Sequence, residues 1–176
     1  QREILADVQR AAHRQDITAV SASLARVDEW PADPWILRWG VLVCLGVAQP
    51  QLAIPFWRRI LTFEEDAYAR IGLAKHALET GAFDEADFHL TALLQQDPSH
   101  GEGWLLRGIV AMQRNAYQQA EEAFERAKLS RADSRKASLG IVMAAMGAER
   151  AEAAWSQLMT LCANEPDDEE CMHWLL

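Results

Sequence analysis

The chain repeats itself every 34 residues. Three consecutive segments align under one another without a gap: 67–100, 101–134 and 135–168. One column of this alignment contains only alanine, at Ala86, Ala120 and Ala154. A repeat of this length predicts stacked units that bury a shared core between neighbours, not a closed globule around one pocket. We therefore expect function on a long shared surface.

Each repeat divides into two amphipathic helices. In the first aligned repeat, Tyr68–Thr80 has apolar residues at the three-and-four spacing of one helical face, and Asp84–Gln95 resumes it. Gly81 interrupts the pattern, and Pro98 ends it because proline disfavours helical geometry in the preceding residue. Small residues such as Ala74 and Gly108 are expected where the two helices of one pair come closest.

The pattern extends upstream more weakly. Two further helix pairs are predicted, at Glu3–His13 with Asp16–Glu29, and at Trp35–Ala48 with Gln51–Phe63. In the second of these the close contact falls at Gly40 or Val41, with Leu52 or Ala53 opposite. Pro50 suits a first helical turn, whereas Pro55 should distort or delay the helix start. Downstream, Glu170–Leu176 is expected to open a further first helix, so the chain is interpreted as a segment of a longer array.

The composition excludes several partner classes. A net charge of −9 opposes a phosphate backbone, because nucleic-acid affinity depends mainly on Lys and Arg. Anionic membrane surfaces are disfavoured for the same reason. The most apolar stretch, Trp39–Ala48, is shorter than the ~20 residues that span a bilayer. The expectation is therefore no nucleic acid and no membrane insertion.

No catalytic or metal-binding motif is found. Of the five histidines, His76 and His89 could approach each other within one helix pair, but two histidines alone make a poor metal site, and all five are interpreted as surface or turn residues. The acidic run from Glu165 to Glu170 is interpreted as a solvated turn, and Cys162, Cys171 and His173 fit no usual zinc spacing. Three unevenly spaced cysteines indicate no disulfide framework, with Cys44 and Cys162 as buried thiols in a reducing compartment. We expect no catalytic residue, no metal and no cofactor, and a cytoplasmic protein.

The repeat resembles the tetratricopeptide repeat family. The second aligned repeat matches the family pattern best, at Trp104, Gly108, Ala120, Phe124 and Ala127. The other two match it at Leu73, Ala74, Ala86, Pro98, Ala154 and Pro166. Arg107, where leucine is usual, and Ala132, where proline is usual, depart from it. The resemblance implies an all-α fold, a right-handed α-solenoid of antiparallel helix pairs. The pairs would be 1–32, 33–66, 67–100, 101–134 and 135–168, with a further helix starting in 169–176, all in one array over 1–176.

The resemblance also implies a concave groove lined by the first helix of each pair. The positions that match it are Tyr68, Ile71, Lys75, Glu79, Glu102, Leu105, Ile109, Gln113, Lys136, Leu139, Met143 and Met146, with Arg38 and Val41 as additions upstream. The Lys and Asn residues with which a chaperone-binding subfamily grips a C-terminal carboxylate are not present. The predicted groove is largely apolar and suits an extended or helical segment with aliphatic anchors. Alternatively, Ile71, Leu105 and Leu139 are covered by neighbouring helices.

Seven tryptophans are many for this length. Packing between helices is the simplest explanation for four of them, Trp35, Trp39, Trp57 and Trp104. Two or more exposed on one face would mark a partner site, because aromatic residues concentrate at binding hot spots.

Three functions remain open. The first is a non-catalytic scaffold whose groove holds a protein or peptide partner. The second is a regulatory or substrate-presenting segment of a larger enzyme or signalling protein. The stretch Ala69–Ala86 is similar to repeats appended to bacterial response regulators, which favours a bacterial origin. The third is self-assembly, as a homodimer through the groove or the exposed repeat end.

Overall fold

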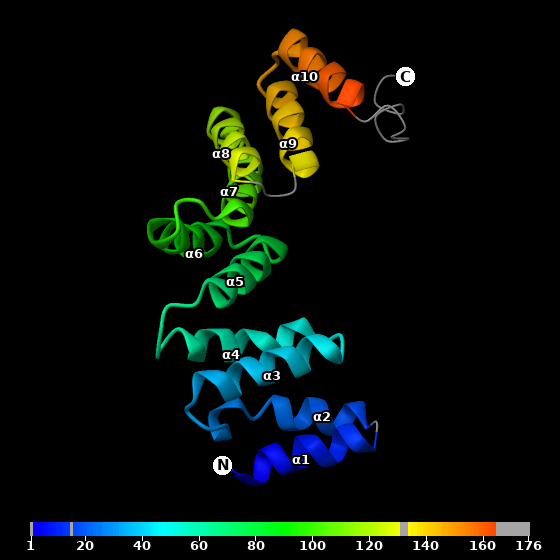
Figure 1. The fold of residues 1–176 in the computed structure, drawn as a ribbon, viewed down its shortest axis with the longest axis vertical. Helices are drawn as coiled ribbons and strands as arrows, with labels where there is room; N and C mark the ends of the chain where they lie inside the picture. The colour runs from blue at the N-terminus through cyan, green and yellow to red at the C-terminus, as the bar shows by residue number, and fades with distance from the viewer. Residues whose placement is uncertain (1, 15, 131–133, 165–176) are drawn as a thin grey trace. The chain divides into compact units, whose positions relative to one another are not determined.

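The fold is entirely helical. The computed structural model describes residues 2–14, 16–130 and 134–164, and within these ranges it contains ten α-helices and no strand (Figure 1). The expected all-α helical-repeat class is confirmed. The chain divides into two compact units, residues 1–76 (unit 1) and 77–176 (unit 2). A single array over the whole chain stays a prediction.

Unit 1 contains four helices and most of a fifth. These are α1 (Arg2–His13), α2 (Ile17–Leu24), α3 (Pro34–Gly46), α4 (Ala53–Ile60) and the start of α5 (Ala67–Glu79). Aspartates begin three of them: the side chains of Asp16, Asp33 and Asp66 accept hydrogen bonds from the backbone N–H groups of Ala19, Trp35 and Ala69. Each cap satisfies a backbone donor that the first helical turn leaves without a partner.

Trp30 is the centre of the unit 1 core. Its side chain is fully buried, and its indole Nε1 donates to the carbonyl oxygen of Ser23 over 3.2 Å. The ring meets Phe56 edge-on at 4.8 Å between centroids. A Cβ on Gly40 would lie only 2.4 Å from the Phe56 ring, so Gly40 is a close contact of α3 with α4. Ala53, fully buried, is the small residue of α4.

Pro55 affects the helix start as expected. Pro50–Leu52 form a 3₁₀ turn, and α4 begins only at Ala53. Pro55 therefore lies in the first turn of α4, where its missing N–H removes no intrahelical hydrogen bond. The delayed start that the sequence predicted is confirmed.

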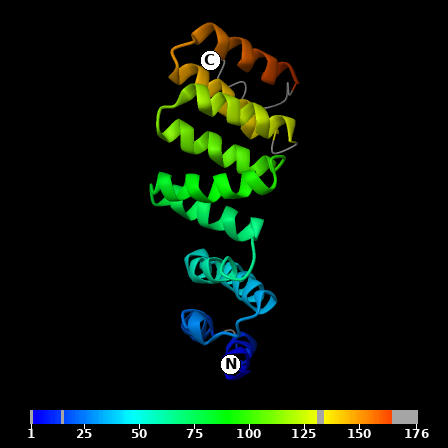
Figure 2. The ribbon, with the colours of Figure 1, turned by 90° about the vertical axis from the view of Figure 1, so that its left-hand side faces the viewer.

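Unit 2 stacks its helices in chain order. It contains the end of α5, then α6 (Phe83–Gln96), α7 (Gly101–Gln113), α8 (Tyr117–Leu129), α9 (Ser134–Gly147) and α10 (Ala151–Asn164). From α6 to α10 each helix packs on the next, and Figure 2 shows them as successive layers from green to orange. The first helices of consecutive pairs, α7 and α9, are also in contact. This contact brings equivalent positions of two repeats together.

Phe124 links three helices of unit 2. Its ring is 3% exposed and lies on α8. A Cβ added at Gly108 of α7 would come within 2.5 Å of this ring, and one at Gly140 of α9 within 2.7 Å. Both glycines are required because a side chain at either position would occupy the space that the aromatic ring fills.

The repeat period is visible in the backbone as well. Gly81, Asn115 and Glu149, spaced by 34 residues, have φ values of 74°, 56° and 58°. Each residue joins the two helices of a pair in the left-handed conformation that glycine and asparagine tolerate best. In unit 1 the corresponding residue is Ala48, with φ of 56°, one place later than the period requires. This displaced left-handed residue lies just before the 3₁₀ turn Pro50–Leu52 and the delayed start of α4.

Arginines connect successive pairs of unit 2. Arg114, which follows α7, forms ion pairs with Asp84 and Asp87 of α6. Arg150, which precedes α10, forms one with Glu121 of α8. Asp87 and Glu121 occupy the same position in their repeats, whereas Arg150 lies two residues beyond Ala148, the equivalent of Arg114.

Candidate functional site

The strongest candidate site lies on α7 and α9. We define the α7–α9 face as the four apolar residues Leu105, Ile109, Leu139 and Met143, at equivalent positions of the two helices. Leu105 and Leu139 are half-buried, whereas Ile109 is 36% and Met143 50% exposed. An apolar stripe that remains partly in contact with water on two adjoining helices is available to a ligand.

Polar residues border this face. Glu102 and Gln113 lie at the two ends of α7, and Lys136 lies in the first turn of α9; all three are exposed. Met146, one turn beyond Met143, extends the apolar stripe and is 53% exposed. Methionine adapts its flexible side chain to ligands of different shape, so two exposed methionines favour an adjustable surface.

The remaining predicted groove residues are divided between the units. Tyr68, Ile71 and Lys75 belong to unit 1, while Glu79, at the end of α5, belongs to unit 2 and is exposed. Tyr68 and Lys75 are exposed, but Ile71 is only 5% exposed. For Ile71 the alternative of burial applies, and it offers no surface to a ligand.

Helix α3 has an exposed aromatic face that the sequence did not predict. Trp35 is 78% exposed, so the expectation that it packs between helices is wrong. Leu42 and Trp39 are also exposed, and Trp35, Trp39 and Leu42 follow the spacing of one helical face. Trp57 is buried and Trp104 half-buried, as the packing interpretation requires.

A small apolar cleft adjoins the α3 face. Its volume is about 260 Å³, and it is lined by Arg38, Val41, Leu42, Ile60, Asp66 and Tyr68. Arg38 forms ion pairs with Asp66 and Glu64 and lies over the Trp35 ring at 5.6 Å. The hydrogen bond to Asp66 raises the pKa of Arg38 above its ordinary value. Because Asp66 also caps α5, both charges are held in structural roles.

The buried titratable groups are structural as well. Burial raises the pKa of the Cys44 thiol to about 12, which keeps it protonated and unreactive. His89 is 8% exposed, so the surface interpretation is wrong for this histidine; its ring contacts Phe88 at 5.2 Å. His100 is a turn histidine, as expected: its Nδ1 accepts a hydrogen bond from the backbone N–H of Gly103 and begins α7. Cys162 is only half-buried.

The described residues hold neither a metal-binding cluster nor a membrane-spanning helix. Across residues 2–14, 16–130 and 134–164, no three His, Cys, Asp or Glu side chains lie close enough to hold a metal ion. Within the same ranges no helix combines the length and hydropathy that crossing a bilayer requires. The acidic run 165–170, the predicted helix start 169–176, Cys171, His173 and Ala132 lie outside the described residues.

One family model matches part of the chain. Residues 77–139 match the model of a tetratricopeptide repeat family. No curated protein sequence matches the chain.

Among solved structures, a tetratricopeptide repeat protein from Parabacteroides merdae superposes with a TM-score of 0.76 at 18% identity, over 97% of this chain and 68% of its own. PilW, a type IV pilus biogenesis factor, gives 0.72 at 17% identity, over 98% and 81%. YrrB, described as a tetratricopeptide repeat protein with an unusual peptide-binding site, gives 0.72 at 12% identity, over 94% and 87%. At these identities the likeness establishes a shared fold. The chain therefore has the fold of solved tetratricopeptide repeat proteins, and its residues 77–139 match the sequence pattern of a tetratricopeptide repeat family.

Proposed function

We propose that the chain is a protein-interaction scaffold whose α7–α9 face binds an extended or helical segment of a partner protein. Tetratricopeptide repeats are generally non-catalytic interaction modules, which supports the general role. The partly exposed apolar residues at equivalent positions of α7 and α9 carry the specific proposal. Such a face suits aliphatic anchors spaced along one side of a peptide.

The composition of the face indicates which peptides it takes. Ile109 and Met143 would contact apolar side chains, and Glu102 and Lys136 present opposite charges at equivalent positions of the two helices. No lysine or asparagine stands at the apolar positions themselves, so the affinity should come from buried apolar area and not from a terminal carboxylate. The peptide-binding site reported for YrrB supports peptide recognition in this fold, while the ligand stays a proposal here.

Glutamate substitutions at Ile109 and Met143, the two exposed residues of the α7–α9 face, test the proposal. Peptides are selected from a displayed library on the wild-type chain, and their affinity is then measured for Ile109→Glu and Met143→Glu. Each glutamate should weaken binding at least about tenfold, because a carboxylate would be desolvated against an apolar anchor. Leu129→Glu is the matched control, since Leu129 is an 82% exposed apolar residue of α8.

Helical content by circular dichroism verifies that the variants fold. Unchanged affinity in both folded groove variants, or an equal loss in the Leu129 control, would show that the peptides bind elsewhere.

The last described helix favours self-assembly as a second candidate. Trp155 and Met159 of α10 are 53% and 47% exposed. The equivalent positions of α8 are Glu121 and Glu125, which are polar. A second copy that covers Trp155 and Met159 would remove this apolar area from water. Light scattering decides between the states: a mass of one chain at all concentrations excludes self-assembly, and a dimer that Trp155→Glu dissociates supports it.

A cytoplasmic location is also part of the proposal. The buried, unpaired Cys44 is compatible with a reducing compartment.

A further inference from the structure

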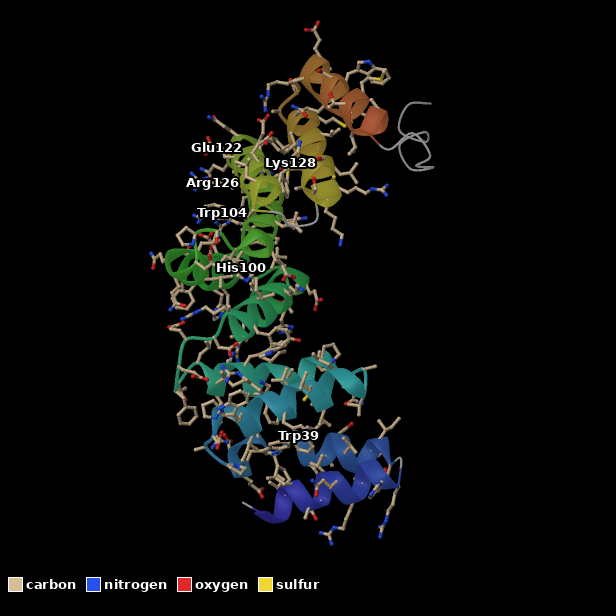
Figure 3. The ribbon with its side chains drawn as sticks, viewed as in Figure 1. Trp39, His100, Trp104, Glu122, Arg126 and Lys128 are labelled. Atoms are coloured by element: carbon tan, nitrogen blue, oxygen red, sulfur yellow. The ribbon has the colours of Figure 1, made fainter. Side chains whose placement is uncertain are left out.

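A second cleft lies on the side of α7 that faces away from Leu105 and Ile109, and aromatic and charged side chains line it. It has a volume of about 250 Å³ and is lined by Trp104, Arg107, Gln119, Glu122, Ala123 and Arg126. Successive residues of a helix are rotated by about 100°, so Trp104 and Arg107 point away from the side that carries Leu105 and Ile109. In Figure 3, Trp104, Arg126 and Glu122 lie on one side of the α7 and α8 pair. The cleft is therefore separate from the α7–α9 face.

Two guanidinium groups surround one indole ring in this cleft. The Cζ atom of Arg126 lies 4.5 Å from the centroid of the Trp104 ring, and that of Arg107 lies 5.6 Å from it. The indole is itself fixed, because its Nε1 donates to the carbonyl oxygen of Pro98 over 2.8 Å. Stacking on a fixed aromatic ring limits the freedom of both arginines before any ligand binds.

Neither guanidinium has a carboxylate partner in the described part of the chain. Other arginines do: Arg38, Arg114 and Arg150 all form ion pairs with Asp or Glu. Glu122, one turn before Arg126, lines the same cleft but forms no ion pair with it. In a protein of net charge −9, two unneutralised guanidinium groups beside one cleft make a local positive site.

Arg107 stacks on Trp104, but this contact gives its N–H groups no hydrogen-bond acceptor. Arg107 occupies the position where the repeat pattern usually has leucine, and its side chain is half-buried. A leucine there would contribute apolar contacts to the helix pair, whereas arginine contributes a charge and five N–H donors. The structure gives this charge no intramolecular acceptor among the described residues, so its acceptor is expected from a ligand.

We propose that Trp104, Arg107 and Arg126 form a second binding site, which takes an oxyanion on a peptide side chain of the partner. Guanidinium groups donate paired hydrogen bonds to carboxylate and phosphate oxygens. The adjoining cleft of about 780 Å³ shares Glu122 and Arg126 and adds Glu121 and Glu125. Arg150 of this cleft pairs with Glu121, so Glu122 and Glu125 are the carboxylates that repel a long acidic stretch and restrict the anion to one or two residues.

The test uses short peptides of defined charge. Acetyl-Gly-Glu-Glu-Gly-amide is titrated into the ¹⁵N-labelled chain, and the indole signal of Trp104 and the Nε–H signals of Arg107 and Arg126 are followed by NMR. The same peptide with glutamine at both positions is the neutral control. A phosphoserine peptide forms the third arm: tighter binding than the glutamate peptide identifies phosphate as the natural oxyanion, and weaker binding identifies carboxylate.

Substitutions distinguish the site from general attraction. Arg107→Leu restores the usual repeat residue and should leave thermal stability at or above that of the wild type, while it weakens the glutamate peptide about tenfold. Arg126→Leu should have a similar effect on binding. Glu122→Gln should strengthen binding, because it removes the competing carboxylate from the cleft.

Lys128→Leu is the control for net charge. Lys128 also lies on α8, but it lines a different cleft, with Ser134 and Arg135. Its replacement should leave the affinity unchanged. Equal shifts with the glutamate and glutamine peptides, full affinity in folded Arg107→Leu, or an equal loss in Lys128→Leu would each overturn the proposal.

Discussion

Replacement of Gly108 by alanine should destabilise unit 2, although alanine favours helices. The new Cβ would lie 2.5 Å from Cε1 of Phe124, about 1 Å closer than carbon atoms pack at rest. The ring cannot retreat freely, since its other edge is against Gly140 of α9. Overpacking of this kind costs roughly 1–3 kcal/mol. Higher helix propensity offsets about 1 kcal/mol of this, so the expected net loss is about 1–2 kcal/mol.

Thermal unfolding followed by far-UV circular dichroism measures this loss. For a chain of this size the midpoint should fall by roughly 3–6 °C. Amide hydrogen exchange shows which helices are destabilised, and we expect lower protection in α7, α8 and α9. Gly46→Ala is the matched control: no atom lies within 4 Å of its Cβ position, and it should be neutral or slightly stabilising.

A second substitution tests the mechanism itself. Phe124→Leu places in α8 the residue that its repeat equivalents Leu90 and Leu158 already have. In the Phe124→Leu background, Gly108→Ala should lower the free energy of unfolding by less than it does in the wild type, because the smaller side chain leaves room for the methyl group. A wild-type midpoint in Gly108→Ala alone, or an undiminished cost of Gly108→Ala in the Phe124→Leu background, would refute the steric explanation.

Three further predictions concern single residues. Glu149→Gly should raise the free energy of unfolding by roughly 0.5–1 kcal/mol in urea, because glycine adopts the positive φ without strain. Cys162 should react with a thiol reagent in the native chain, whereas Cys44, whose pKa is raised by burial, should react only after unfolding. The hydrogen bond from the Ser99 hydroxyl lowers the pKa of Asp97, so Ser99→Ala should raise that pKa in a ¹³C NMR titration. The stabilisation that Ser99→Ala removes is present above the pKa of the unfolded carboxyl group and is lost as the pH falls through the lower folded pKa.

The helices could be predicted because their signals are local. Apolar spacing, Gly81 and Pro98 depend only on the neighbouring sequence, and most predicted helices within the described residues are found with shifts of up to three residues at their ends. The predicted helix Asp16–Glu29 is an exception, because α2 ends at Leu24 and a separate 3₁₀ turn, Val27–Glu29, follows it. The 34-residue period also predicted where small residues are buried between helices: Ala86, Ala120 and Ala154 are all buried. Steric exclusion acts at these positions in every repeat, whatever the surface residues are.

The exposure of individual side chains could not be predicted in the same way. Trp35 and Ile71 are both apolar residues on first helices, yet one is exposed and the other is buried. The difference depends on how neighbouring helices cover each position, which a sequence pattern does not contain. The arginine cleft was missed for a related reason. Arg107 was visible as a departure from the repeat, but Arg126 joins it only through the packing of α8 on α7.

The ion pairs between successive repeats make unit 2 sensitive to ionic strength. Arg114 with Asp84 and Asp87, and Arg150 with Glu121, connect the exposed corners of neighbouring pairs. Salt screens such exposed charges, whereas the apolar contacts between the same helices persist. A repeat protein unfolds as one body only while the coupling between neighbours exceeds the differences in stability among its repeats. Added salt should therefore broaden the unfolding transition of unit 2 more than it lowers the midpoint.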